Sequence, residues 1–447
     1  MVSAALPLPG PFRDRVKTRT SRTTMVVALQ LIAMGDTQPL PSSALYADRI
    51  IAWVPPTDGY DPCWRPPSKV EAALLSAKRN GDWRGYIEVL RGAAVFHRTT
   101  RAAADSGQAY DIPTVWDPRL HTYCEPLYTA GELPAAEAEI VYIGKHFENH
   151  VAPEAHVDHR HYLAVNPGTP VEVYFPMTTE NRRTLARVGA AVVGPHAAGV
   201  HTLWNRPQRG EVAFGLGCAA LLNANNGSPW NELGHGDFGY DYDRRLLAEW
   251  WGITDRATLR DQLATLLDTQ AGWTWEFVLS IREALERVEG GPVDPVRWRA
   301  KVTAVLGERL SRVGRPEDHT TEVSVLCRLV GRIVRYEQRF RADGLLPIDG
   351  HVRSVQAWDL GRAAAVARWG AAARYCSLAE AQRTITRAGE LVRPYYDSWE
   401  ALAAGYIMGR CLHFDGEEFG HWYLEMVETA RLLAAAPDGP WQTQPWK

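Results

Sequence analysis

Two tryptophans and an arginine share one helix face in the stretch AWDLGRAAAVARWG, which begins at Ala357. Trp358, Arg362 and Trp369 follow one another at i, i+4 and i+11, so a helix would place the arginine between the tryptophans. A guanidinium walled by indole rings can bind a carboxylate or a phosphate. The alternative is structural: Arg362 pairs with Asp359 at i,i+3 and packs its stem under tryptophan. We favour the structural interpretation.

A second stripe of the same kind occurs in SWEALAAGYIMGR, where Trp399, Tyr406 and Arg410 lie at helical spacing. Both segments are rich in alanine and glycine, which lets two helices approach closely and would allow the stripes to face each other. In that arrangement the two arginines would form a site for a small anion. The candidate binding residues are Trp358, Asp359, Arg362, Trp369, Trp399, Tyr406 and Arg410.

The segment HFDGEEFGHW combines histidine and carboxylate side chains of the kind that bind metal ions. Glu418 and His421 form an E-x-x-H pair, and His413 and Asp415 precede it. Di-iron helical bundles use two such pairs together with two further glutamates, so one pair is weak evidence. These four residues would carry a metal-dependent enzyme activity as the alternative interpretation. We expect no cofactor.

The run HFENHVAPEAHVDHRHY also gathers possible metal ligands, which are His146, His150, Glu154, His156, Asp158, His159 and His161. On a helix His146 and His150 would share a face. However, the order is H-x-E-x-H rather than the H-E-x-x-H of zinc enzymes, and Pro153 interrupts the segment. We expect a surface loop. No G-x-S-x-G elbow or Walker loop occurs elsewhere in the chain.

The elements that hold these residues change character along the chain. Residues 67–206 mix helical spacing, as in KVEAALLSAKRNGDWRGYIEVL, with strand-like runs such as AEIVYIG and HYLAVNPGTPVEVYF. Asn166, Pro167 and Gly168 mark a tight structural turn between two strands, in which Asn166 can hydrogen-bond its own backbone. This region therefore predicts a small α/β domain.

Residues 213–447 show helical periodicity throughout, with repeated capping signals. Asp294 before proline and the SLAE box that begins at Ser377 predict helix starts. Gly252 and Gly370 each follow a tryptophan and predict helix ends with a left-handed glycine. The fold class is α+β overall, with a small α/β domain followed by an all-α helical bundle.

Length and charge narrow the possible functions. A chain of 447 residues exceeds one hydrophobic core, and residues 1–66, rich in proline and other turn formers, predict a flexible leader. The net charge of -3 provides no general attraction for nucleic acid. Six dispersed cysteines and the absence of any apolar run of about 18 residues favour a cytoplasmic protein without a membrane span.

Two resemblances cover most of the chain. Residues 67–206, with EAALLSAKRNGDWRGYIEVLRGA and LAVNPGTPVEV, resemble the SseB-type N-terminal domain, which implies a small accessory or interaction domain. Residues 213–447 resemble the DUF1266 family through LLNANNGSPW, LLAEWWGITDRATLRDQL, AWDLGRAAAVARWG, SWEALAAGYIMGR and PDGPWQTQPW in that order. The segment CLHFDGEEFGHWY departs from the family pattern. The DUF1266 name carries no assigned function, so the resemblance implies a fold and little mechanism.

These observations favour a non-enzymatic bacterial protein that binds another protein, in a chaperone-like, secretion-associated or toxin-neutralising role. The alternatives are the metal-dependent enzyme and a small-anion sensor that uses Arg362 and Arg410. The sensor interpretation requires that no protein acid pairs with either guanidinium.

Overall fold

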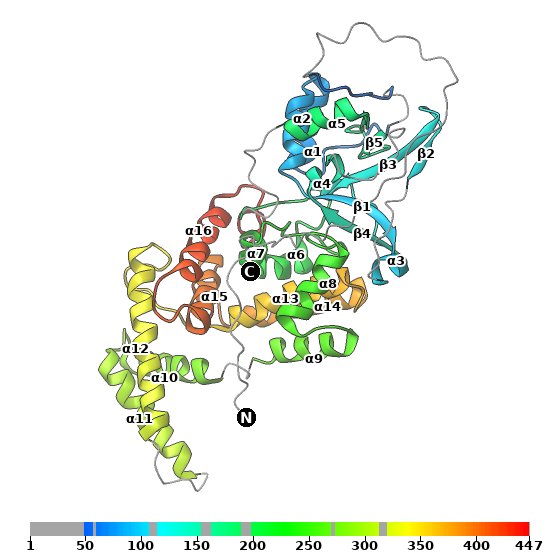
Figure 1. Cartoon of the computed structure of the whole chain (residues 1–447). Helices are drawn as coiled ribbons and strands as arrows, with labels where there is room; N and C mark the ends of the chain where they lie inside the picture. Colours follow the sequence, from blue (N-terminus) through cyan, green and yellow to red (C-terminus); the bar gives the residue numbers. More distant parts are fainter. Residues whose placement is uncertain are drawn as a thin grey trace, which may run out of the picture. The chain divides into compact units, whose positions relative to one another are not determined.

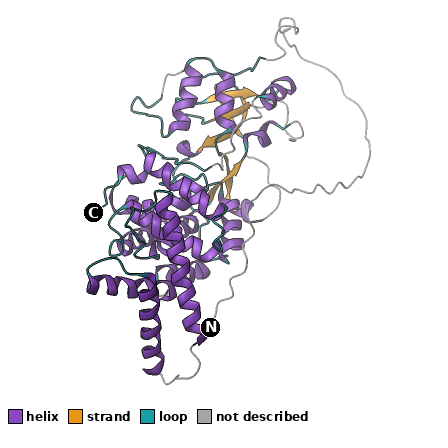
Figure 2. Ribbon diagram, turned by 90° about the vertical axis from the view of Figure 1, so that its left-hand side faces the viewer, coloured by secondary structure: helices purple, strands orange, loops and turns teal. Residues whose placement is uncertain are grey.

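The computed structural model describes residues 49–56, 60–106, 114–152, 162–188, 198–269, 273–312 and 320–446. The strands lie in the first half of the chain and the second half is helical. Figure 2 shows the strands in orange gathered in one region, apart from most of the purple helices. The fold class is therefore α+β, as the sequence predicted. The described residues from Ile50 onward form one compact unit.

The α/β region is built around a sheet in the order β4-β1-β3-β5-β6, with β2 paired to β3. β3 and β5 run parallel, and the other pairs are antiparallel. Its elements are α1 (Lys69–Arg79), α2 (Trp83–Arg91), β1 (Val95–Thr100), α3 (Arg101–Asp105), β2 (Val115–Asp117), β3 (Thr122–Thr129), η1 (Ala130–Glu132), β4 (Ile140–Lys145), α4 (Phe147–Val151), β5 (Tyr162–Val165), β6 (Val173–Pro176) and α5 (Thr179–Arg187). Side chains from α1, α2 and the strands form a separate apolar core.

The turn between β5 and β6 depends on Asn166, which is fully buried and has a left-handed φ of 47°. The turn itself was predicted, but the role of the Asn166 side chain was not. Its Oδ1 accepts a hydrogen bond from the Thr129 backbone N–H at 2.8 Å, and its Nδ2 donates to Thr129 Oγ1 at 3.0 Å. The asparagine thus joins the turn to the end of β3 instead of closing on its own backbone.

Residues 50–56, which the sequence placed in the leader, pack on this sheet. The Trp53 backbone N–H donates to the Tyr174 carbonyl at 2.7 Å, and the Tyr174 N–H returns a bond of 2.9 Å. Asn181 accepts from the Ile51 N–H and donates to the Ile51 carbonyl. Of the other leader residues, 49 and 60–66 are also described, whereas 1–48 and 57–59 lie outside the described residues.

The helical region contains α6 (Gly210–Cys218), α7 (Ala220–Asn225), α8 (Tyr240–Trp251), α9 (Arg256–Leu267), α10 (Trp273–Glu289), α11 (Pro295–Arg312), α12 (Thr320–Ala342), α13 (Gln356–Ala372), α14 (Leu378–Val392), α15 (Trp399–Phe414), α16 (His421–Ala435) and α17 (Pro440–Thr443). Helix α13 is buried along almost its whole length and contacts α6, α7, α8, α9, α14 and α15. None of the described helices is long and apolar enough to cross a bilayer.

Most predicted helix ends are confirmed, with one exception. Gly252 ends α8 in a left-handed conformation, and Ser377 with Glu380 forms the capping box of α14. The prediction for Gly370 is wrong, because α13 continues through it to Ala372. A Cβ at Gly370 would stand 2.6 Å from a methyl group of Leu259, so the glycine lets α9 approach α13 closely.

Helices α10, α11 and α12 pack against one another, as Figure 1 shows. Helix α12 also contacts α15, so this group is joined to the helices around α13. Arg282 on α10 and Glu337 on α12 form a buried ion pair that links the two helices. The distance between Arg282 Nη1 and Glu337 Oε1 is 2.8 Å. The same Glu337 Oε1 accepts from the Val352 backbone N–H in the connection to α13.

Candidate functional site

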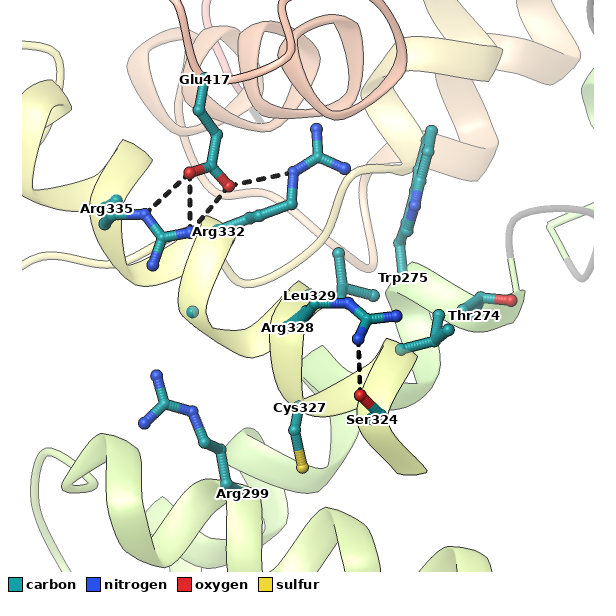
Figure 3. Close-up of a pocket in the computed structure, with 12 residues that line it drawn as sticks. Thr274, Trp275, Arg299, Ser324, Cys327, Arg328, Leu329, Arg332, Arg335 and Glu417 are labelled. Carbon is teal, nitrogen blue, oxygen red and sulfur yellow. Dashed lines mark hydrogen bonds and ion pairs between the residues drawn. The ribbon is translucent and has the colours of Figure 1, made fainter. Parts of the chain in front are cut away.

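A groove of about 620 Å³ opens on α12, between α10, α11 and the loop that joins α15 to α16. Four arginines line it, together with one carboxylate, Glu417. Trp275 of α10 and Leu329 of α12 supply apolar surface beside these charges. Figure 3 shows the lining side chains.

Helix periodicity places three of the arginines in a row. Arg328, Arg332 and Arg335 stand at i, i+4 and i+7 on α12, so they share a face. Arg299 comes from α11 and points towards this row in Figure 3. The groove is therefore assembled from two packed helices, which hold the positive charges in a fixed arrangement.

Glu417 balances part of this charge. Its carboxylate accepts from Arg335 Nε at 2.8 Å and from Arg335 Nη2 at 2.7 and 2.8 Å, and it lies 3.2 Å from Arg332 Nε. The backbone N–H of Glu417 donates to the hydroxyl of the buried Tyr336 at 2.9 Å. Tyr336 in turn donates to Asp415 at 2.7 Å. A buried tyrosine thus fixes the loop that presents Glu417.

The remaining two arginines have no acid partner among the residues that the structure describes. Arg328 donates to the hydroxyl of Ser324 at 2.5 Å, and the Arg299 side chain makes no ion pair in the described parts of the chain. The groove consequently carries four guanidinium groups against one carboxylate. Such a set of planar donors is suited to binding carboxylate or phosphate groups.

The predicted stripe on α13 forms the structural contacts that we favoured. Arg362 pairs with Asp359 at i,i+3, and its Nε donates to the Trp358 carbonyl at 3.1 Å. Its guanidinium lies 4.1 Å from the centre of the Trp358 ring and 5.6 Å from that of Trp251. The second wall is therefore Trp251 of α8, and not Trp369 as the spacing suggested.

The second stripe faces the first, as expected. Tyr406 of α15 contacts Trp358 of α13, with ring centres 5.0 Å apart. Burial raises the pKa of Tyr406 to about 12, and Arg410 and Arg362 lie close enough to oppose that rise. Arg410 lies over Trp422, donates to the Trp422 carbonyl at 3.3 Å and is 3.9 Å from Glu425. Because Asp359 pairs with Arg362, the condition for a small-anion sensor is not met at that arginine.

Two residues of the predicted set lie elsewhere. Trp369 donates from Nε1 to Asp237 at 2.7 Å, next to the buried Arg368. Trp399 packs against Trp441 and Trp446 near the end of the chain. The structure thus brings together Trp358, Asp359, Arg362, Tyr406 and Arg410, and separates Trp369 and Trp399 from them.

The His and acid residues near the end of α15 do not assemble a metal site. Among the described residues, no group of three His, Cys, Asp or Glu side chains could hold a metal ion. Asp415 instead accepts from the backbone N–H groups of Phe419 and Gly420 at 3.0 Å. His413, Glu418 and His421 are exposed, and His421 lies against the Trp422 ring.

Another E-x-x-H pair, Glu232 and His235, escaped the sequence analysis. Arg206 donates to Glu232 at 3.0 Å, and His235 Nε2 lies 2.7 Å from the Pro134 carbonyl. The His235 contact joins the helical region to the segment before β4. The pair therefore has a structural role in the described chain.

The histidine-rich run is only partly described. His146 is exposed and precedes α4, whereas His150 is buried on α4. The two histidines therefore do not share a helix face. His150 Nδ1 lies 2.7 Å from Glu125 Oε1. The other residues of the run, Glu154, His156, Asp158, His159 and His161, lie outside the described residues.

The arginine groove was missed in the sequence. The spacing of Arg328, Arg332 and Arg335 on one predicted helix was a visible signal. Arg299 and Glu417 belong to other segments, and only the packing of α11 and of the α15–α16 loop on α12 brings them to the groove.

Comparison with known proteins assigns a family model to most of the helical region. The model described as protein of unknown function (DUF1266) matches residues 246–446, which include the whole arginine groove. This match confirms the DUF1266 resemblance over that range. No curated protein and no solved structure matches the chain. The SseB-like resemblance of residues 67–206 stays a prediction.

Proposed function

We propose that this protein is a non-enzymatic accessory protein that binds an acidic segment of another protein in the arginine groove. The observation that carries the proposal is the charge of the groove, in which four guanidinium groups face one carboxylate. Complementary charge accelerates encounter and discriminates against partners of the wrong charge. A role of this kind covers the chaperone-like, secretion-associated and toxin-neutralising functions that the sequence favours.

The surroundings of the arginines support a protein segment as the ligand. Trp275 and Leu329 lie beside the charges, and tryptophan and arginine are enriched where protein interfaces concentrate their binding energy. The net charge of -3 over the whole chain provides no broad basic surface for a nucleic acid backbone. The basic groove is thus a local feature on a slightly acidic protein.

A binding measurement with matched charge-reversal variants tests the proposal. The probe is a fluorescein-labelled octaglutamate peptide, followed by fluorescence anisotropy with the full chain. The double variant Arg299→Glu, Arg328→Glu should weaken binding at least about tenfold, because it replaces two attractive charges with repulsive ones. The control is Arg383→Glu, Arg387→Glu, which changes the net charge equally on the exposed face of α14.

The control variant should bind the peptide within about twofold of wild type, and wild-type affinity should fall as salt increases. Thermal unfolding of each variant first establishes that it is folded. Equal losses in both double variants would mean a general charge effect and would contradict a specific groove. Equally tight binding of an octaglutamine peptide would also contradict the proposal.

A further inference from the structure

A glycine stands in the middle of the arginine row. Gly331 lies inside α12, where glycine costs helix stability relative to alanine. A Cβ on Gly331 would stand 3.1 Å from Arg335 Nη1 and 3.2 Å from Arg299 Nη2. The missing side chain therefore leaves room for the terminal nitrogens of two arginines from different helices.

These two nitrogens are not engaged by the other groups of the groove. Glu417 binds Arg335 through Nε and Nη2, so that contact leaves Nη1 directed over Gly331. The Arg299 guanidinium makes no ion pair or hydrogen bond within the described ranges. Figure 3 shows the guanidinium of Arg335 above, and that of Arg299 below, the same stretch of α12.

Two cations that approach the same position repel each other, and an anion between them offsets that repulsion. Glu417 cannot serve both, because its contacts are with Arg335 and Arg332. We infer that a carboxylate of the bound acidic segment sits over Gly331 and accepts from Arg299 Nη2 and Arg335 Nη1. This inference rests on the proposed function and places one contact of that ligand.

The geometry matches a carboxylate because its two oxygens can each accept from one guanidinium. Glu417 acts here as a positioning residue, since its grip on Nε and Nη2 orients Arg335. The packing of α11 on α12 keeps the second donor in place. The site therefore joins donors from two helices over a position where a Cβ would crowd both guanidinium groups.

The substitution Gly331→Ala tests the inference, because it fills the contact point without changing any charge. Octaglutamate binding by the full chain should weaken at least about tenfold, while the melting temperature stays equal or rises because alanine favours a helix. The control is Gly307→Ala on α11, where a Cβ would meet nothing within 4 Å. That variant should bind the peptide as wild type does.

The outcomes separate the inference from the proposed function. If Gly331→Ala binds as tightly as Gly307→Ala while the double charge reversal abolishes binding, the groove binds the peptide. The position of a carboxylate over Gly331 is then refuted. If neither change affects binding, both proposals fail. Inorganic phosphate is added as a competitor against acetate at equal ionic strength. If phosphate displaces the peptide at a far lower concentration than acetate does, the position over Gly331 binds phosphate. That result would overturn the inference of a carboxylate there.

Discussion

Arg368 and Asp237 form an ion pair whose side chains are 1% and 4% exposed. Arg368 Nη2 lies 2.5 Å from Asp237 Oδ1, and Trp369 Nε1 donates to the second oxygen at 2.7 Å. Burial, and after it the neighbouring Asp237, raises the pKa of Asp243 well above its usual range. Because the raised pKa favours the neutral form of Asp243, Asp237 is the carboxylate that compensates the charge of the buried Arg368 guanidinium.

The variant Asp237→Ala should lower the free energy of unfolding by about 3 kcal/mol, because it leaves the Arg368 charge uncompensated in the interior. Urea unfolding followed by circular dichroism measures the change. Asp397→Ala removes the partner of Arg353 in an exposed pair and should cost less than about 1 kcal/mol. Similar losses in the two variants would show that burial does not decide the strength of these pairs.

The turn between β5 and β6 allows a test at the scale of one element. Asn166→Ala should destabilise the protein by about 3 kcal/mol, because the buried Thr129 N–H loses its acceptor and alanine tolerates the left-handed φ poorly. Asn166→Gly removes the same hydrogen bonds but accepts that φ, so its loss should be about 1 kcal/mol smaller. Chemical unfolding of both variants gives the comparison. A glycine variant as unstable as the alanine variant would exclude a contribution from the backbone conformation.

Features that depend on residues close together in the sequence could be predicted from the sequence. The capping box at Ser377, the left-handed Gly252 and the pairing of Arg362 with Asp359 all involve residues a few positions apart. The continuation of α13 through Gly370 was not predictable, because this glycine allows close packing against Leu259 of another helix and does not end its own helix. Local signals thus define the starts and ends of helices only where tertiary packing agrees with them.

The candidate site was predictable only in part for the same reason. The row of arginines on α12 follows from helix periodicity, but Arg299 and Glu417 reach it through packing. The stripe on α13 was predicted from its spacing, but the second tryptophan beside Arg362 is Trp251 of α8. Sequence spacing identified side chains that share a helix face, and could not identify what lies opposite that face.

At the scale of the whole molecule, side chains before α6 connect the helices to the sheet. Asn205 donates to the Gly131 carbonyl at 3.0 Å, and Arg206 pairs with Glu232 next to the segment that follows β3. Glu132 lies in this junction and accepts from Trp64 Nε1 at 2.9 Å. Burial, with a smaller contribution from Glu71, raises the pKa of Glu132 to about 7, although Trp64 and Arg206 oppose the shift.

A raised pKa means that the folded protein holds the Glu132 proton more tightly than the unfolded chain does. The resulting stability is complete below the ordinary pKa of 4.5 and is lost as the pH rises through 7. Glu132→Gln cannot ionise, so it should be more stable than wild type by about 2 kcal/mol at pH 8 relative to the difference at pH 5.

Urea unfolding of wild type and variant at pH 5 and pH 8 isolates this group, because all other titrating residues are common to both proteins. The exposed Glu137, changed to glutamine, should alter stability by less than about 0.5 kcal/mol at either pH, since its side chain remains in water. A difference between Glu132→Gln and wild type that stays constant from pH 5 to pH 8 would refute a shifted carboxyl at the junction. An increasing difference would mean that ionisation of one side chain weakens the connection between sheet and helices in the neutral range.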